Sequence, residues 1–379
     1  MEWKEVDICQ LCDSVSETYK GNASEVVLIN TSDVLDGKCL NHEYVPNKKL
    51  KGQFKKTFRK GDILYSEIRP ANKRFCFVDF EPKDYIASTK LMVLRAHEDV
   101  DPQYLYQILR SNDTLTQLQM LAESRSGTFP QITYSELSNI MVSLPSQKAQ
   151  KNIVSILSSL DRKIELNNKI NADLEEMAQA IFKNWFVDFE PFKDGKFVDS
   201  ELGMIPEGWK VGCLGDIAEI TSGKRPPKKS KDKTKELFIP LIGASDIMGF
   251  TSDVLYERPI LVIGRVGTHG VVQRFQEKCW PSDNTLVIES SYYNYVYQLL
   301  KGIDYSAINR GSTQPLITQT DVKNTDVIIA PENVLKEYES ITSTLFSKHR
   351  ANIKENSRLS TLRDTLLPRL MSGELEVPE

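Results

Sequence analysis

A long helix that occurs twice constrains this fold more than any other feature of the sequence. Residues 146–185 contain neither Gly nor Pro, and Pro145 stands directly before them, where a proline suits the start of a helix. Apolar side chains recur there at steps of three and four and form one narrow stripe. At ~1.5 Å per residue, such a helix reaches about 55–60 Å. The stripe consists of Ile153, Leu157, Leu160, Ile164, Leu174, Ala178 and Ile181.

A second copy of this helix follows 185 residues later. Residues 332–371 form another stretch without Gly, again headed by a proline, and its apolar stripe coincides with that of the first copy. The polar interruptions coincide as well, because Asn167 falls on Asn352 and Asn171 falls on Asn356. The sequence therefore predicts two equivalent long helices.

Neither helix can bury a narrow stripe alone, so we expect the two copies to pack on each other as a coiled coil. Asparagines buried in such a seam fix its register at some cost in stability. The alternative is a pair of unrelated amphipathic helices. The residues expected in the seam are Ile153, Leu157, Leu160, Asn167, Asn171, Leu174, Ile341, Leu345, Asn352, Asn356 and Leu359.

The segment before the first helix mixes short strands with helices. Residues 26–29, 62–65 and 91–94 are short apolar runs typical of strands. Residues 102–121 open with a proline and carry leucines at helical spacing, which predicts one or two helices. This composition indicates a mixed α+β domain.

The segment between the two long helices repeats the first one. Residues 28–34 correspond to 241–247, and Ile63 is matched with Ile260. The offset between matched segments drifts from 206 to 213 and back to 185, so the loops differ in length between the halves. Divergent loops on a shared scaffold are typical of a duplication in which the recognition surfaces have changed.

The repeat is also circular. Residues 201–210 are reproduced when the C-terminal residues 374–379 are joined to residues 1–4. We therefore expect the two ends of the chain to lie close together and the whole to have approximate twofold symmetry. The expected domains are residues 1–145, a long helix in 146–190, a second domain in 191–330, and a long helix with its tail in 331–379.

Charge is uneven along a chain whose net charge is only −4. Residues 48–60 hold seven cations and no carboxylate, and residues 224–235 hold seven cations and one Asp. Such basic clusters on a slightly acidic protein are compatible with a nucleic-acid partner. No apolar run approaches ~18 residues and the N-terminus does not resemble a signal peptide, so we expect a cytoplasmic protein without a membrane partner.

The six cysteines are expected to be free thiols, as is usual in the cytosol. One spacing leaves an alternative open, because Cys9, Cys12, Cys39 and His42 together resemble a zinc ligand set. The second half carries no equivalent set, since Cys12 falls on Gly215. Buried or incidental thiols are therefore favoured over a metal site.

The layout resembles the specificity subunit of type I restriction–modification enzymes. The most specific markers are residues 126–133 and 311–318, each of which leads toward a proline-headed helix. The opening of the second domain, Gly208 to Ile217, also agrees with the family, whereas the first domain has Cys12 where the family pattern has Gly. The resemblance covers essentially the whole chain.

The resemblance implies a fold of class α+β. Two mixed α/β target-recognition domains would be separated by two long antiparallel coiled-coil helices in a pseudo-twofold circular arrangement. Each domain would read one half of a bipartite, asymmetric site on double-stranded DNA. The helix pair would set the spacer and dock two methyltransferase subunits, and restriction and translocase subunits would join through the complex.

The sequence offers no catalytic core of its own. It has neither an Asn-Pro-Pro-Tyr-like segment nor a phosphate-binding loop, and the glycines of residues 264–270 have the wrong spacing for a dinucleotide site. We therefore expect no cofactor, no metal and no catalytic residue. Two alternatives stay open: a DNA-modifying enzyme complete in one chain, and a coiled-coil scaffold that binds protein without reading DNA.

The candidate DNA contacts fall in three regions of each half: a loop near the start of the domain, a loop at a strand end, and the segment before the second proline-headed turn. Lysines suit phosphates, and arginine can bond guanine bidentately. Solvated loops, surface ion pairs and turn caps are the competing interpretations. A fourth candidate is the 48–60 cluster, in which Phe54 and Phe58 would pack while the lysines face outward. The candidates are Lys20, Arg69, Lys73, Arg74, Arg125, Ser126, Thr128, Gln131, Lys224, Arg225, Lys228, Lys229, Arg265, His269, Arg310, Ser312, Thr313 and Gln314.

Overall fold

The computed structural model describes residues 3–48, 52–124, 130–266, 270–308 and 316–377. The chain divides into two compact units. Unit 1 comprises Met1–Leu166 with Glu355–Glu379, and unit 2 comprises Asn167–Lys354. This division passes through both long helices, so each helix contributes one half to each unit.

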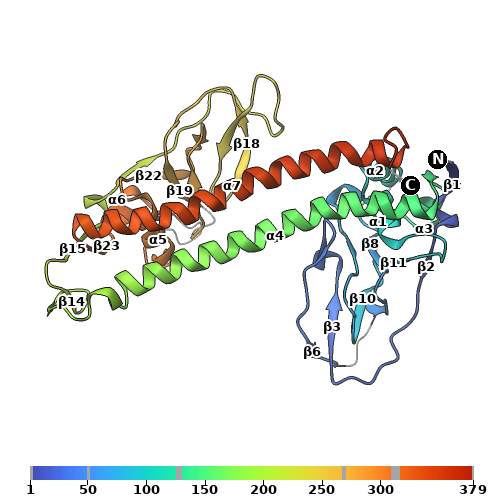
Figure 1. Ribbon diagram of the computed structural model, residues 1–379, viewed down its shortest axis with the longest axis horizontal. Helices are drawn as coiled ribbons and strands as arrows, with labels where there is room; N and C mark the ends of the chain where they lie inside the picture. Colours follow the sequence, from blue (N-terminus) through green and yellow to red (C-terminus); the bar gives the residue numbers. More distant parts are fainter. Residues whose placement is uncertain (1–2, 49–51, 125–129, 267–269, 309–315, 378–379) are drawn as a thin grey trace. The chain divides into compact units, whose positions relative to one another are not determined.

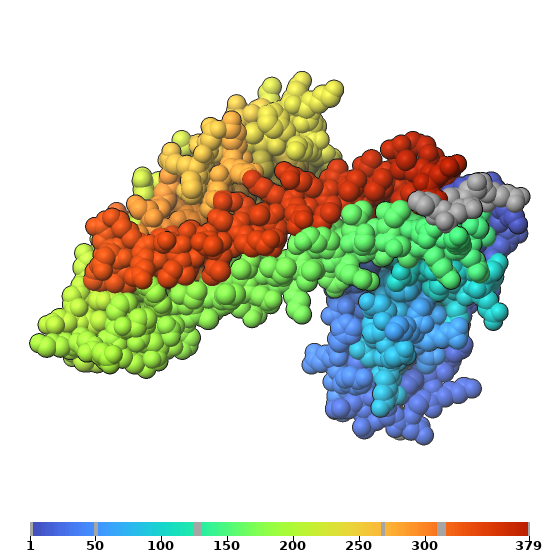
Figure 2. Space-filling model, viewed as in Figure 1, coloured from blue at the N-terminus to red at the C-terminus, as the bar shows by residue number. Residues whose placement is uncertain are grey.

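The two long helices are α4 (Gln147–Phe186) and α7 (Glu332–Met371), each within one residue of the expected bounds. In unit 2, the second half of α4 lies along the first half of α7 (Figures 1 and 2). Asn352 donates from Nδ2 to Oδ1 of Asn171 over 2.9 Å, and the rings of Phe182 and Tyr338 lie 6.3 Å apart. Residue numbers rise along α4 while they fall along α7, so the helices are antiparallel.

Unit 1 contains the complementary halves in the same antiparallel sense. Arg363 of α7 donates to Asp161 of α4 over 2.7 Å, and Lys163 pairs with Glu355 at 3.5 Å. Asp161 also accepts from Arg110 over 2.9 Å, so one carboxylate joins α4 to both α7 and the globular part of the unit.

The seam corrects one expected position. Ile341 is 39% exposed, whereas its neighbour Thr342 is fully buried between the turns of Tyr338 and Phe346. One residue turns the side chain by about 100° around a helix of 3.6 residues per turn, which is enough to leave the seam. Ile153 and Leu157 are fully buried. Asn167, Asn171 and Asn352 are also buried, and the half-buried members are Leu160, Leu174, Leu345, Asn356 and Leu359.

Two sheets and three short helices complete unit 1. A four-stranded antiparallel sheet has the order β2-β11-β8-β9, a second sheet has the order β6-β3-β10-β7, and β1 pairs with β12. The strands are β1 (Lys4–Asp7), β2 (Cys12–Val15), β3 (Glu25–Ile29), β4 (Val34–Leu35), β5 (Lys38–Cys39), β6 (Val45–Pro46), β7 (Phe54–Lys56), β8 (Ile63–Ser66), β9 (Phe75–Phe77), β10 (Tyr85–Ser88), β11 (Leu91–Ala96) and β12 (Met141–Leu144). The helices are α1 (Pro102–Arg110), α2 (Asn112–Glu123) and α3 (Tyr134–Ser138).

The four-stranded sheet of unit 1 is buried on both faces. Ile63 and Met92 face the helices, in a core that also holds Leu157 of α4. Leu64 and Val93 face the second sheet. The unit is therefore layered as helices, sheet and sheet, and the expected strands and helices of residues 26–29, 62–65, 91–94 and 102–121 are all present.

Unit 2 repeats this plan. Its four-stranded sheet has the order β16-β22-β19-β20, β15 pairs with β23, and a second sheet has the order β18-β17-β21. The strands are β13 (Phe197–Val198), β14 (Ile205–Pro206), β15 (Lys210–Cys213), β16 (Glu219–Ser222), β17 (Ile239–Ile242), β18 (Ile247–Thr251), β19 (Ile260–Gly264), β20 (Val272–Phe275), β21 (Trp280–Pro281), β22 (Thr285–Glu289) and β23 (Asp326–Ile329). The helices are α5 (Tyr293–Gly302) and α6 (Gln319–Lys323).

The structure shifts one sequence correspondence by a single residue. Ile63 faces the helices of unit 1, and the residue with the same environment in unit 2 is Leu261. Ile260, its expected partner, faces the second sheet instead. A slip of one residue moves every side chain of a strand to the other face, so the match of Ile63 with Ile260 was wrong by one position.

The N- and C-terminal segments meet in unit 1. Trp3, Leu375 and Val377 share one core, and a Cβ added to Gly373 would lie 2.5 Å from Nε1 of Trp3. Gly373 also has φ +75°, which glycine adopts without strain. The expected closeness of the two chain ends is therefore confirmed. Within the described residues, no helix combines the length and the apolar character needed to cross a bilayer.

Candidate nucleic-acid interface

Antiparallel pairing gathers three chain segments at one edge of the main sheet of unit 2. Both β16 and β19 run antiparallel to β22, so their last residues meet its first ones. Ser222 pairs with Leu286, and Gly264 pairs with Thr285. We define edge 2 as Ser222–Lys224, Gly264–Val266, Asn284 and Leu316–Gln319. The loops that leave β16 and β19 carry the basic residues singled out in the sequence.

The basic loop of unit 2 is tied to edge 2 through its backbone. The amide of Gly223 donates to the carbonyl of Thr285 and that of Lys224 to Pro281, both over 3.0 Å. A Cβ on Gly223 would lie 2.1 Å from the carbonyl oxygen of Ser282, so only glycine allows this approach. The anchored loop presents exposed cations, and these are Lys224, Arg225, Lys228 and Lys229.

The third expected region of unit 2 joins the same edge. The amide of Ile317 donates to the carbonyl of Arg265 over 3.0 Å, and Gln319 donates from Nε2 to the hydroxyl of Ser222 over 2.7 Å. Thr318 caps α6 in a reciprocal box with Asp321. The three candidate regions of unit 2 therefore converge on edge 2.

Unit 1 brings together two of its three candidate regions. The amide of Ile132 donates to the carbonyl of Glu67 over 2.8 Å, and that of Arg69 donates to Pro130 over 3.0 Å. The amide of Glu67 in turn donates to the carbonyl of Lys90 over 3.1 Å. We define edge 1 as Glu67–Arg69, Lys90 and Pro130–Ile132. It is built from the same strand ends as edge 2.

Two cations of edge 1 and its loop sit in backbone conformations that residues other than glycine rarely adopt. Arg69 has φ +46° and Lys73 has φ +52°, and both side chains are exposed. The turn between them is fixed from α2, because the amide of Ala71 donates to Oε1 of Gln119 over 3.0 Å. Such conformations cost about 1–3 kcal/mol each and are concentrated at functional sites.

The structure turns other candidates away from the edges. Arg74 donates from Nη1 to the carbonyl oxygens of Ser32 and Val34 over 3.0 and 3.4 Å, so its guanidinium holds the chain's own backbone. The exposed Lys20 follows Tyr19, whose hydroxyl bonds to Asp84 beside the second sheet. The expected DNA-facing position of Arg74 is thus replaced by a structural one, and Lys20 lies outside edge 1.

The basic cluster of residues 48–60 also departs from expectation in part. Phe58 is buried and Phe54 half-buried, as expected. Lys56, however, points inward and donates from Nζ to the carbonyl oxygens of Thr89 and Leu91 over 3.2 and 2.8 Å. Burial lowers the pKa of this amine below its ordinary value.

Several candidates lie outside the described residues, and the structure reports nothing on them. They are Arg125, Ser126, Thr128, His269, Arg310, Ser312, Thr313 and Gln314. Gln131 is described: it forms a bridge with Ile68, and its Oε1 accepts from Lys90 Nζ over 3.4 Å. Lys90, Glu67 and Asn284 escaped the sequence analysis because only strand pairing brings them to an edge.

No metal centre is formed within the described parts of the chain. Cys12 belongs to the core beneath the helices of unit 1, whereas Cys39 packs against the core between its two sheets. His42 bonds through Nδ1 to the hydroxyl of Tyr85 over 2.9 Å. Because these side chains occupy different environments, the zinc interpretation has no support from the structure.

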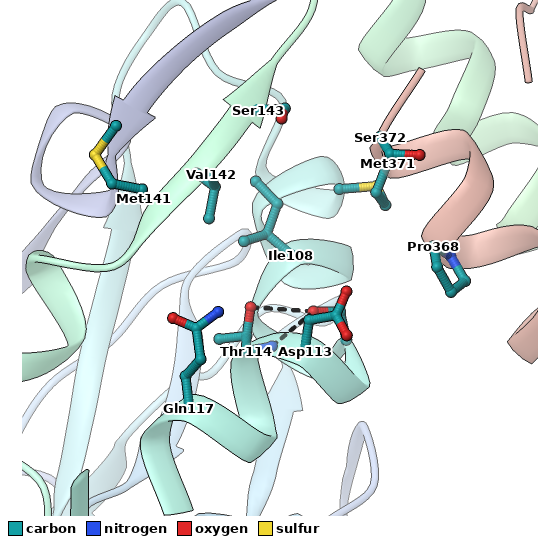
Figure 3. Close-up of a pocket in the computed structure, with 11 residues that line it drawn as sticks. Ile108, Asp113, Thr114, Gln117, Met141, Val142, Ser143, Pro368, Met371 and Ser372 are labelled. Carbon is teal, nitrogen blue, oxygen red and sulfur yellow. Dashed lines mark hydrogen bonds between the residues drawn. The ribbon is translucent and has the colours of Figure 1, made fainter. Parts of the chain in front are cut away.

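A pocket of about 210 Å³ lies elsewhere in unit 1, where α1, α2, β12 and the end of α7 meet (Figure 3). Met141 and Met371 flank it, while Asp113, Thr114 and Gln117 extend from α2. Its lining combines apolar side chains with hydroxyl groups and a single carboxylate. This chemistry differs from the cationic loops of the two edges and does not resemble a catalytic site.

Comparison with known proteins adds a family to this geometry. The model of the type I restriction modification DNA specificity domain matches residues 2–176 and again residues 206–358. The type I restriction enzyme HindI specificity subunit of Haemophilus influenzae is 31% identical, over 99% of this chain and 100% of that protein. The MjaIX specificity subunit of Methanocaldococcus jannaschii is 30% identical, over 89% of this chain and 85% of that protein.

A solved structure shows the same fold. The S subunit of a type I restriction–modification system from M. genitalium superposes with a TM-score of 0.60 at 16% identity, over 100% of this chain and 97% of that one. The fold class of two α/β parts with two long antiparallel helices is therefore confirmed. With two copies of the family domain and relatives that match along their whole length, this chain belongs to the family of type I restriction–modification DNA specificity subunits.

Proposed function

We propose that edges 1 and 2 are the surfaces through which this specificity subunit reads DNA. Each edge would contact one half of a bipartite, asymmetric site on a duplex. The observation that carries the proposal is the convergence of equivalent strand ends in both units, each bordered by exposed cations that the backbone holds in place. An edge formed by loops on a rigid sheet is a common place for binding residues.

The cationic loop of edge 2 suits phosphate contacts, because its lysines are exposed and have no fixed orientation toward a base. Arg69, Lys73 and the half-buried Arg265 are better placed for base contacts, since their backbones are fixed by hydrogen bonds or by the turn. Phosphate contacts position the protein, and base contacts specify the sequence.

The helix pair would set the spacer between the two half-sites and would dock two methyltransferase subunits. Met177 on α4 is 50% exposed and Leu362 on α7 is 47% exposed, and the two positions are equivalent in the internal repeat. Equivalent exposed apolar side chains suit one kind of partner bound twice, and restriction and translocase subunits would join through the same complex. The chain itself would be a non-catalytic subunit that needs no cofactor.

Salt dependence of duplex binding tests the DNA-reading proposal. Each phosphate contact contributes about −0.9 to the slope of log K against log salt concentration. The double variant Lys228→Ala, Lys229→Ala should therefore reduce the magnitude of the slope by about 1.8. The matched control, Lys196→Ala with Lys210→Ala, removes two exposed lysines outside edge 2 and should leave the slope unchanged.

Methylome sequencing tests the specificity role in the assembled complex. Cells with this chain and its cognate methyltransferase subunit should carry a bipartite methylated motif that disappears when this chain alone is deleted. An unchanged methylome, with both subunits expressed, would instead favour the alternative of a coiled-coil scaffold without DNA reading. Binding of a methyl donor by the isolated chain would support a complete enzyme and contradict the proposal.

A further inference from the structure

Glu67 and Arg265 occupy the same backbone position in the two units. Each is the first residue beyond the central strand β8 or β19. Each amide donates to the carbonyl of the residue that precedes the neighbouring strand, Lys90 in unit 1 and Asn284 in unit 2. Each carbonyl accepts from an isoleucine amide, that of Ile132 or Ile317, over 2.8 or 3.0 Å.

The residues beyond these positions agree with this equivalence. Ile68 forms an isolated bridge with Gln131, and Val266 forms one with Leu316. The two edges thus hold residues 67 and 265 by the same three neighbouring segments. We call the position of Glu67 and Arg265 the shared edge position.

The shared edge position carries opposite charges in the two units. Arg265 is half-buried, and no carboxylate within the described residues lies at ion-pair distance from it. Its neighbour Asn284 is uncharged. Glu67 has a side chain that is 25% exposed and lies 3.6 Å from the amine of Lys90, which is itself 50% exposed. Such an exposed pair stabilises by at most ~1 kcal/mol, so it leaves the carboxylate oxygens of Glu67 free to exchange partners.

These side chains have different partners in the major groove. The guanidinium of arginine donates two hydrogen bonds to O6 and N7 of guanine. A carboxylate only accepts, so it is repelled by those guanine atoms and can take a hydrogen bond from N4 of cytosine. A backbone fixed by three hydrogen-bonded segments limits where each side chain can reach, which is the condition for selecting a base.

We infer that the shared edge position selects a base in each half-site: Arg265 selects guanine, and Glu67 selects cytosine on the strand that it faces. This inference rests on the proposed function, because it assumes that both edges read DNA. It goes further by assigning base selectivity to a single structural position and by giving the two units opposite preferences.

The test is the methylated motif produced in cells by the chain with its cognate methyltransferase subunit. Arg265→Gln should relax a guanine at one position of one half-site, with discrimination falling about 5- to 150-fold, and should leave the other half-site unchanged. Glu67→Gln should relax a cytosine in the other half-site. Glu67→Arg should convert that preference to guanine.

Matched controls remove the same charges at the opposite end of the same sheets. Arg258→Gln acts before β19, where Arg258 pairs with Glu289, and Glu98→Gln acts after β11. Both controls should leave the whole motif unchanged. Arg265→Lys provides a second test if the Gln variant does not fold, because it keeps the charge and removes only the bidentate geometry.

The outcomes separate the inference from the proposed function. If the unaltered chain yields no motif that depends on it, the proposed function fails. If the unaltered chain yields a bipartite motif and folded variants at residues 67 and 265 leave both half-sites intact, the inference fails alone. A relaxed motif in the control variants would also overturn it, because the effect would then follow overall charge.

Discussion

The hydrogen bond between Asn171 and Asn352 offers the sharpest test of the helix seam. Asn352→Leu removes the donor of a 2.9 Å bond and leaves the carbonyl of Asn171, a residue only 7% exposed, without that partner. An unsatisfied buried acceptor costs about 1–3 kcal/mol. In a domain of 150–250 residues, ~1 kcal/mol corresponds to about 2–4 °C, so the Tm of the variant should fall by about 2–12 °C.

The double variant Asn171→Leu, Asn352→Leu should behave differently. Replacing both partners by apolar side chains of similar volume is nearly neutral or stabilising, because no buried polar group is left unpaired. A double-mutant cycle should therefore show a coupling of about 2 kcal/mol or more between the two sites. The helices should stay paired while their register becomes less specific, since asparagines in a seam serve mainly to fix register.

Thermal unfolding of the full chain measures all three variants against Gln179→Leu, an exposed amide on the same helix. That control should change stability by less than about 0.5 kcal/mol. The reasoning is refuted if the effects of the two single variants simply add in the double variant. Additivity would mean that the hydrogen bond contributes no coupling between α4 and α7.

Three further perturbations follow from the structure. Burial lowers the pKa of His349 below its ordinary 6.5, so the unfolded chain binds the proton first and stability falls as the pH drops below about 6.5; a His349→Gln variant should show a shallower decline of Tm in that window, and an identical decline would exclude the histidine as a cause. Gly223→Ala should detach the basic loop of edge 2 and weaken DNA binding without loss of the folded core, as judged by a binding titration beside circular dichroism; unchanged affinity would show that the loop's anchor is dispensable. Asp161→Asn removes the charge between two arginines whose side chains are 8% and 16% exposed, and should cost about 3–5 kcal/mol in denaturant unfolding; a loss below ~1 kcal/mol would mean that water already screens this network.

The long helices were predictable because their signal is redundant. Forty residues without glycine, a stripe at steps of three and four and a proline before the first turn all predict the same element. The repeat of 185 residues then placed Asn352 opposite the first helix. The exchange of Ile341 for Thr342 in the seam was not predictable, because a hydroxyl residue in an amphipathic stripe gives no sign that it is buried.

The register of the central strands was harder to predict. Residues 260–263 are all apolar and all buried, because β19 has a core on each face. Such a strand lacks the alternation that would reveal its orientation, so the alignment of Ile63 with Ile260 could slip by one residue unnoticed. The same slip hid the equivalence of Glu67 and Arg265.

The candidate site was predicted in its regions but not in its details. Strand-end loops and basic runs identify surfaces, because loops carry recognition residues and cations attract phosphates. They do not reveal that the guanidinium of Arg74 holds backbone carbonyls or that the amine of Lys56 points inward. Both contacts satisfy carbonyl groups that become available only after the strands have paired.

The division of both helices between the units has a consequence for the order in which the chain can fold during its synthesis. Unit 2 is continuous in sequence, whereas unit 1 is completed only by Glu355–Glu379. At ~5–20 residues per second, the ribosome needs on the order of 10–40 s to make the stretch that separates the two parts of unit 1.

During that interval, Ile153 and Leu157 have been made but their neighbours Leu367 and Leu370 in the same core have not. The first half of α4 then exposes an apolar stripe on the nascent chain. The domain that begins first is therefore finished last, and its unfinished core is the stretch most in need of a chaperone while translation continues.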